Sequence, residues 1–240
     1  MTRLLVLNPN TSPEVTQAFV AEARRVAPPD VQIEGVTGAF GARIVTSEAE
    51  NVIAAHAALH LAAEHAGDVD GVILAISFDT GLRALSQLLP VPVVGVTEAA
   101  IAQAGRGPLG VVCFGASSQP LYARLLTGYG VEPVAWEIVE IASRAAYLDA
   151  EAQDAAVADA IARLAQKGAK ASILLGTVVA GMAARLNPRA VIPISDAAAA
   201  VHLCLARVEA GAPLPTQPVP VSGTIGLSPA LANLIAGKTP

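Results

Sequence analysis

Short apolar runs rich in Val, Ile and Leu alternate along the chain with longer Ala- and Leu-rich segments whose polar residues recur at helical spacing. This alternation is typical of parallel strands joined by crossover helices. We predict strands at residues 4–7, 33–37, 71–76, 93–94, 110–113, 134–136, 171–175 and 191–192. We predict helices at residues 13–26, 47–66, 81–88, 98–104, 119–129, 151–166, 181–185, 196–208 and 229–236. The predicted fold class is therefore α/β, with parallel sheets flanked by helices.

Segments of the first half of the chain recur in the same order in the second half. The matched pairs are residues 5–12 with 111–118, residues 73–82 with 173–182, and residues 93–100 with 191–198. This repeat predicts two pseudo-symmetric α/β lobes whose equivalent positions face each other across a cleft.

We divide the chain into two lobes and a tail. The N-terminal lobe covers residues 1–106, and the C-terminal segment of the chain can pack back onto it. The C-terminal lobe covers residues 107–208. Residues 209–240 are rich in Gly and Pro and are expected to form a strap over the surface.

Polar residues gather where the predicted strands end. The mirrored sets are Asn8, Asn10, Thr11 and Ser12 with Ser117 and Ser118, then Ser77, Asp79 and Thr80 with Thr177, and finally Glu98 with Asp196. Parallel sheets bind ligands outside the carboxyl ends of their strands, so we expect these residues to surround one site between the lobes. Hydroxyls and helix N-terminal amides suit a small anion or an amide-rich ring.

The charge balance excludes several classes of partner. The chain has 240 residues with 15 Lys and Arg against 20 Asp and Glu, which gives a formal net charge of −5 at pH 7. Nucleic acids and anionic membranes bind clustered cations, so neither is an expected partner. Every apolar stretch is interrupted well before the ~20 residues that span a bilayer, and the first apolar run is too short for a signal peptide. The sequence predicts a soluble, cytoplasmic protein with a small-molecule substrate.

Metal-binding and disulfide patterns are weak. Cys113 and Cys204 are too few for a disulfide framework or a zinc site. His56 and His60 have the i, i+4 spacing of a metal-binding pair, but no carboxylate lies between them in an Ala-rich segment. We therefore predict no metal.

Four of these segments carry a family resemblance. Residues 8–11 (Asn-Pro-Asn-Thr) resemble the opening motif of the Asp/Glu/hydantoin racemase superfamily. Residues 77–82 are similar to its Cys-Phe-x-Asp-Pro-Gly-Leu segment, and residues 175–182 to its Leu-Gly-Cys-Ala-Gly-Met segment. Residues 192–196 are similar to its Pro-Val-Ile-Asp-Gly stretch, so that the likeness runs in order over residues 1–208. It implies a cofactor-independent enzyme of the hydantoin and allantoin racemase type, and relatives tend to form homo-oligomers.

The departures from the family pattern lie at its catalytic positions. Family racemases use two cysteines, one in each lobe, which remove and return the α-proton on opposite faces of the substrate. The resemblance places Ser77 and Thr177 at these positions. A hydroxyl at its ordinary pKa is a far poorer base than a thiolate. Cys113 aligns with a strand-end position and does not replace either cysteine.

The remaining candidates receive roles as substrate-binding, catalytic or orienting groups. We expect Asn10, Thr80, Ser117 and Ser118 to hold a carbonyl or carboxylate of the substrate. Asp79 is either a general base or the N-cap of the helix after Gly81. Glu48 is expected to contact the substrate, as a binding group or a general base, or else to lie in a solvated first turn of its helix. Glu98 and Asp196 are orienting or capping residues.

The predicted function is a racemase or isomerase that transfers a proton at a carbon α to a carbonyl. Its substrate would be a hydantoin-like ring or an amino-acid-derived carboxylate. One alternative is a cyclic-amide hydrolase or decarboxylase on the same scaffold, with Ser77 as nucleophile or with water activated by Asp79 or Glu48. The other alternative is a ligand-binding relative without catalysis.

Overall fold

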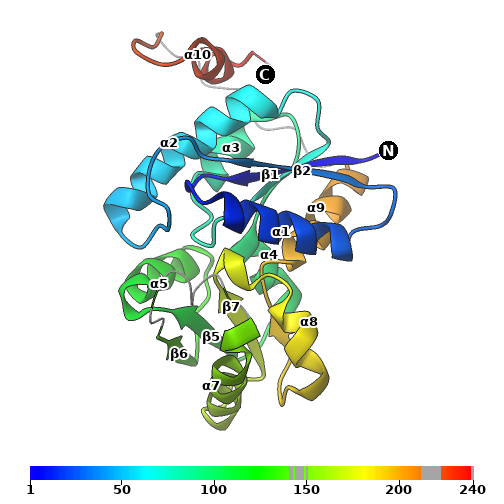
Figure 1. Ribbon diagram of the computed structural model, residues 1–240, viewed down its shortest axis with the longest axis vertical. Coiled ribbons are helices and arrows are strands. Elements are labelled where there is room, and N and C mark those ends of the chain that lie inside the picture. The colour runs from blue at the N-terminus through cyan, green and yellow to red at the C-terminus, as the bar shows by residue number, and fades with distance from the viewer. Residues whose placement is uncertain (141–142, 144–148, 150, 212–222, 239–240) are drawn as a thin grey trace.

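A computed structural model describes residues 1–140, 143, 149, 151–211 and 223–238, and in it the chain forms two parallel four-stranded sheets (Figure 1). The first sheet has the order β2-β1-β3-β4, and the second has the equivalent order β6-β5-β7-β8. The strands are β1 (Arg3–Asn8), β2 (Gln32–Thr37), β3 (Gly71–Leu74), β4 (Val93–Gly95), β5 (Leu109–Phe114), β6 (Ala135–Val139), β7 (Ala171–Leu175) and β8 (Ile194–Ser195). The predicted α/β fold with two similar halves is confirmed.

Helices cover both faces of each sheet (Figure 1). They are α1 (Pro13–Val26), α2 (Glu48–His65), α3 (Leu82–Leu88), α4 (Val96–Ala104), α5 (Gln119–Gly128), α7 (Asp154–Gln166), α8 (Met182–Leu186), α9 (Ala199–Glu209) and α10 (Pro229–Ile235). Their starts follow local rules. Pro13 is the first residue of α1, and at α2 the Ser47 and Glu50 side chains form a reciprocal capping box.

One apolar cluster joins the two halves. Ile76 and Phe78, which follow β3, are buried together with Tyr122 and Leu126 of α5 and with strands of the second sheet. The second sheet therefore shares core with the segment that carries Ser77. Apolar burial of this kind contributes roughly 25 cal/mol per Å² and fixes the loops after β3 against the second half.

The C-terminal helices pack on the first sheet. α9 contacts α4, β3 and β4, and its Cys204 is buried in one cluster with Leu4. A methyl group at Gly71 would lie 2.7 Å from the Cys204 sulfur, so glycine permits this close approach. α10 packs on α2, whereas residues 212–222 and 239–240 of the predicted strap lie outside the described residues. The lobe boundaries at residues 106 and 208 stay a prediction.

The last strand differs from its prediction. β8 covers Ile194–Ser195 rather than residues 191–192, and Val191 is exposed. The Asn187 side chain explains the placement, because its Oδ1 accepts a bond from the Ile194 amide and its Nδ2 donates to the Ile194 carbonyl. The side chain thus pairs with Ile194 as a neighbouring strand would.

This shift corrects one of the mirrored pairs. Ile73 lies beside Val94 in the first sheet, whereas its counterpart Ile173 lies beside Ser195 in the second. The residue equivalent to Asp196 is therefore Gly95, and the predicted pairing of Glu98 with Asp196 is wrong. The equivalence of Ser77 and Thr177, each four residues after its matched isoleucine, stays a prediction.

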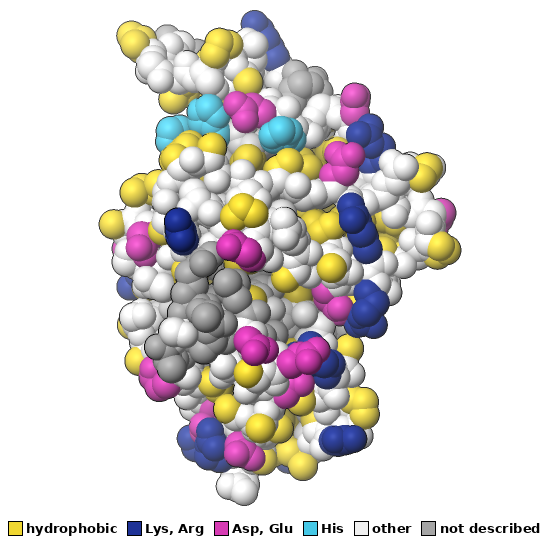
Figure 2. All heavy atoms as spheres, viewed as in Figure 1, with side chains coloured by type: hydrophobic (Ala, Val, Ile, Leu, Met, Phe, Trp, Pro, Cys, Tyr) yellow, Lys and Arg dark blue, Asp and Glu magenta, His cyan; other side chains and the backbone are white. Residues whose placement is uncertain are grey.

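Two surface findings complete the description. Acidic and basic side chains are interspersed on the face that Figure 2 shows, which agrees with the mild negative charge of the chain. None of the helices in the described ranges has both the length and the apolar composition that a bilayer crossing requires.

Candidate active site

A cavity of about 340 Å³ lies between the two sheets at the carboxyl ends of their strands. This position is where parallel sheets bind ligands. None of the described residues that line it carries a charge: each is either apolar or a neutral polar residue. The lining residues are Asn10, Val15, Ile44, Val45, Thr46, Ile76, Ser77, Phe78, Phe114, Gly115, Ser117, Ser118, Tyr122, Ser143, Leu175 and Thr177.

Ser77 and Thr177 reach this cavity from opposite sheets. Ser77 follows β3, and Thr177 begins a short 3₁₀ turn after β7. Both side chains are buried, and the Ser77 Oγ lies 3.0 Å from the Tyr122 hydroxyl oxygen of α5. Within the described residues, the Thr177 hydroxyl has no hydrogen-bond partner. The cavity therefore holds the two hydroxyls that the sequence placed at the family's cysteine positions.

Asn10 enters the cavity from the loop after β1. Its Oδ1 accepts hydrogen bonds of 2.9 Å from Asn8 Nδ2 and from the Ser12 amide. These two donors fix which end of the Asn10 amide is the acceptor, and Asn8 is itself held by Thr16 at 2.9 Å. The Asn10 Nδ2 has no protein partner in the described part of the chain, so it is left to donate to a ligand.

Ser117 and Ser118 lie in a 3₁₀ turn (Ala116–Ser118) between β5 and α5. Ser118 is buried, Ser117 is exposed, and both line the cavity. Gly115 precedes them at φ 77°, a left-handed conformation that glycine adopts without steric cost. The turn therefore brings hydroxyl groups and the start of α5 to the cavity.

Thr80 and Glu48, which the sequence assigned to substrate binding, are not among the lining residues. The Thr80 hydroxyl donates a hydrogen bond of 2.5 Å to Asn51 Oδ1 of α2. Glu48 is exposed in the first turn of α2 and forms an ion pair with Arg124 of α5. Their positions agree with structural roles, and their part in binding stays a prediction.

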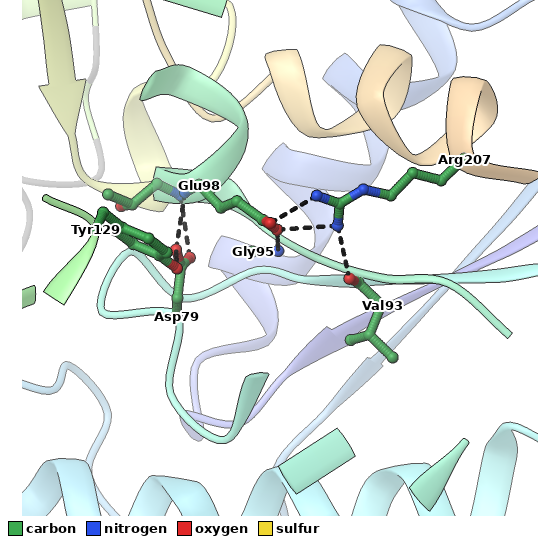
Figure 3. Close-up of polar contacts among 7 residues, drawn as sticks. Asp79, Val93, Gly95, Glu98, Tyr129 and Arg207 are labelled. Carbon is green, nitrogen blue, oxygen red and sulfur yellow. Dashed lines mark hydrogen bonds and ion pairs between the residues drawn. The ribbon is translucent and has the colours of Figure 1, made fainter. Parts of the chain in front are cut away.

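Asp79 is in the same turn as Ser77, but its carboxylate points toward Tyr129 and Glu98 (Figure 3). It accepts hydrogen bonds from the amides of Thr97 and Glu98 at 3.0 and 2.8 Å, and from the Tyr129 hydroxyl at 2.6 Å. It therefore caps α4 rather than α3, the helix after Gly81. Burial raises the pKa of Asp79 to about 7, partly offset by these three donors.

Glu98 and Asp196 both contact helix or loop amides outside the cavity lining. Glu98 forms an ion pair of 2.6 Å with Arg207 of α9, which also donates to the Val93 carbonyl (Figure 3). Asp196 accepts bonds from the amides of Ala183 and Ala198 at 2.8 and 2.9 Å, and burial raises its pKa. Each carboxylate joins neighbouring loops of its own sheet.

Tyr122 and Tyr129 are the site residues that the sequence did not indicate. Both lie on or directly after α5, an amphipathic helix in which aromatic residues ordinarily fill core positions. Their partners Ser77 and Asp79 are 45 and 50 residues away. The one local sign was that both tyrosines occur in the helix that follows the Ser117–Ser118 turn.

Thiol and metal chemistry have little support in the described residues. Cys113 and Cys204 are buried, and burial raises the pKa of each thiol to about 12. Neither thiol lines the cavity. The rings of His56 and His60 lie 5.4 Å apart on α2, but the described part of the chain contains no group of three His, Cys, Asp or Glu side chains that could hold a metal ion.

Comparisons with known proteins decide the family. The model of the Asp/Glu/hydantoin racemase family matches residues 4–204, which is most of the chain. The chain belongs to the Asp/Glu/hydantoin racemase family. A hydantoin racemase from Paenarthrobacter aurescens is 32% identical over 104 residues, and this match covers 41% of the chain but only 43% of that relative.

Solved structures of this family extend the likeness over nearly the whole chain. The allantoin racemase from Klebsiella pneumoniae is 26% identical, with a TM-score of 0.87 over 96% of this chain and 99% of that one. The allantoin racemase from Pseudomonas fluorescens is 28% identical, with a TM-score of 0.78 over 90% and 94% of the two chains. Family members thus share the two-sheet architecture described above.

Proposed function

We propose that this protein is a cofactor-independent racemase that moves a proton at the carbon beside a carbonyl group in a hydantoin-like ring. One observation carries the proposal: Ser77, which follows β3, and Thr177, which follows β7, line the same cavity. Racemisation needs one group on each face of the reacting carbon, one to remove the proton and one to return it. Family membership and the likeness to allantoin racemases support this assignment.

The described residues of the lining carry no charge, which favours a neutral ring over an amino-acid carboxylate. A buried carboxylate needs a cation or several strong donors, whereas a ring with alternating N–H and C=O groups needs paired donors and acceptors. The Asn10 Nδ2 and the Ser118 hydroxyl, which enter the cavity from loops of the two different sheets, provide such groups. Val15, Ile76 and Leu175 provide apolar contacts for the faces of the ring.

The proposed proton transfer is balanced between two hydroxyl groups. The ionised hydroxyl on one face takes the proton from the ring carbon, and the negative charge passes to the carbonyl oxygen, where Asn10 Nδ2 donates to it. The neutral hydroxyl on the opposite face then returns a proton to the carbon. Because the ionised form of a serine or threonine is scarce at neutral pH, we expect slower turnover than a pair of thiols would give.

Substitutions at both hydroxyls test this function. Ser77→Ala and Thr177→Ala are each expected to abolish α-proton exchange while ligand binding is retained, and Ser86→Ala on the exposed face of α3 is the control. The double variant Ser77→Cys with Thr177→Cys is expected to exchange the proton at least about tenfold faster than the natural protein. Exchange at the natural rate in the alanine variants would contradict the proposal. Cytoplasmic location and assembly into a homo-oligomer stay predictions.

A further inference from the structure

A hydrogen bond joins the turn that carries Ser77 to the end of α5. The Tyr129 hydroxyl, at the end of α5, donates to Asp79 Oδ2 at 2.6 Å (Figure 3). We propose that Asp79 and Tyr129 are positioning residues, whose hydrogen bond holds α5 against the turn after β3 and thereby sets the place of the Ser77 hydroxyl in the cavity. This inference rests on the proposed function, in which Ser77 faces the reacting carbon.

The turn that carries Ser77 is held to α4 at two points. The Thr97 hydroxyl donates to the Ser77 carbonyl at 2.6 Å, and the Thr97 amide donates to Asp79 Oδ1 at 3.0 Å. The Asp79 amide in turn donates to the Ile76 carbonyl at 2.9 Å. A movement of the Asp79 carboxylate therefore moves the backbone on both sides of Ser77.

Two backbone features allow the Asp79 carboxylate to reach α4: the φ of Asp79 itself and the glycine at position 95. Asp79 has φ 47°, a left-handed conformation that is strained for a residue with a side chain. A methyl group at Gly95 would lie 2.3 Å from the Asp79 Cγ, so only glycine leaves room for the carboxylate at this end of β4. The strain and the close approach are both offset by the three hydrogen bonds that Asp79 accepts.

The nearby charged side chains do not bond the Asp79 carboxylate, which accepts hydrogen bonds from Tyr129 and from the α4 amides. Glu98 is the neighbouring acid, but its carboxylate is bound by Arg207 at 2.6 and 3.1 Å. Arg83 is the other nearby cation and acts on Tyr129. Burial raises the pKa of Asp79 to about 7 and also raises the pKa of Tyr129, so the Asp79 carboxyl can change its charge near neutral pH.

The first test removes one hydroxyl group from the contact. Tyr129→Phe is expected to lower kcat for α-proton exchange by about tenfold while KM changes by less than about twofold, because Tyr129 does not line the cavity. Thr127→Val is the matched control, since among the described residues the Thr127 hydroxyl bonds only the Ala123 carbonyl of its own helix. A kcat in Tyr129→Phe equal to that of the control would overturn the proposal.

The second test needs no turnover. In Tyr129→Phe, and also in Asp79→Asn, hydrogen exchange of the Asp79, Thr97 and Glu98 amides is expected to be at least about tenfold faster than in Thr127→Val. In Tyr129→Phe the ¹³C titration of the Asp79 carboxyl is expected to move to higher pH, because a donor to the ionised form is lost. If the natural protein exchanges no substrate proton, the proposed function fails, and these amides still decide whether the contact holds the turn. Unchanged exchange would overturn the proposal.

Discussion

The hydroxyl oxygens of Ser77 and Tyr122 lie 3.0 Å apart, and they join the turn after β3 to the helix after β5. The Phe78 ring stacks on the Tyr122 ring with a centroid distance of 4.4 Å, which holds the phenol in place. Ser77 therefore has a neighbour from the opposite sheet that orients its hydroxyl toward the cavity.

Tyr122→Phe tests whether this contact serves catalysis. The variant keeps the ring stack with Phe78 and loses only the hydroxyl, so the melting temperature is expected to change by no more than a few degrees. We expect kcat for α-proton exchange to fall between about tenfold and about a hundredfold, because a misplaced reacting group is costly. NMR exchange rates and thermal melts measure both quantities. A kcat within about twofold of the natural value would show that Tyr122 only fills space.

Asn10→Asp tests the donor that faces the ligand. The aspartate keeps the Oδ1 that binds Asn8 and Ser12, but it replaces the Nδ2 donor by an oxygen and adds a charge to a cavity whose described lining has none. The Kd for a hydantoin is expected to rise by about tenfold or more, because the ligand loses a buried hydrogen bond and its acceptor atom is left without a partner. Titration calorimetry gives the Kd, and Asn233→Asp on the exposed face of α10 is the control. Equal Kd values in the two variants would exclude Asn10 from binding.

Gly95→Ala tests the close packing of the Asp79 carboxylate. The added methyl would meet the carboxylate at 2.3 to 2.6 Å, so the free energy of unfolding is expected to fall by about 1–3 kcal/mol. Gly107→Ala is the matched control, because a methyl group at Gly107 would have no heavy atom within 4 Å. Urea denaturation compares the two. A loss in Gly95→Ala no larger than in the control would mean that the carboxylate is free to leave this position.

The raised pKa of Asp79 predicts a pH-dependent stability. Its folded value of about 7 lies above the ordinary 3.8, so between these values the folded chain binds more protons than the unfolded chain. The free energy of unfolding therefore falls as pH rises through this window, by at most about 1.4 kcal/mol per pH unit from this one group. We expect the difference between the natural protein and Asp79→Asn to fall over the same window and to be flat above it.

The comparison is made by urea denaturation at several pH values. Asp196, whose pKa is also raised, is present in both proteins and cancels from the difference. Asp68→Asn, at an exposed position, is the control for the substitution itself. A difference that rises with pH, or that stays flat for Asp79→Asn, contradicts the raised pKa.

The sequence predicted the parts of the site that depend on strand ends. Parallel strands finish at one edge, and the internal repeat related Ser77 to Thr177, so both could be placed at a shared cavity. Asn10, Ser117 and Ser118 follow from the same rule. These positions depend on local strand and turn patterns, which one chain shows directly.

The remaining parts depend on contacts between distant segments. Asp79 caps α4 rather than the nearer α3, because its left-handed φ turns the carboxylate toward Gly95. The same turn directs Thr80 to Asn51 and away from the cavity. Tyr122 and Tyr129 reach their partners only after the sheets pack, and no sequence spacing records that packing.

Proton NMR of the natural protein in D₂O, with allantoin and a panel of hydantoins, is the most direct check on racemase chemistry. We expect the signal of the proton at the ring carbon beside the carbonyl to disappear while the other signals of the compound remain. Ser77→Ala and Thr177→Ala should each abolish this loss. New signals from a ring-opened or decarboxylated product, or an α-proton signal that persists while the ligand lines broaden on binding, would contradict racemisation by this pair of hydroxyls.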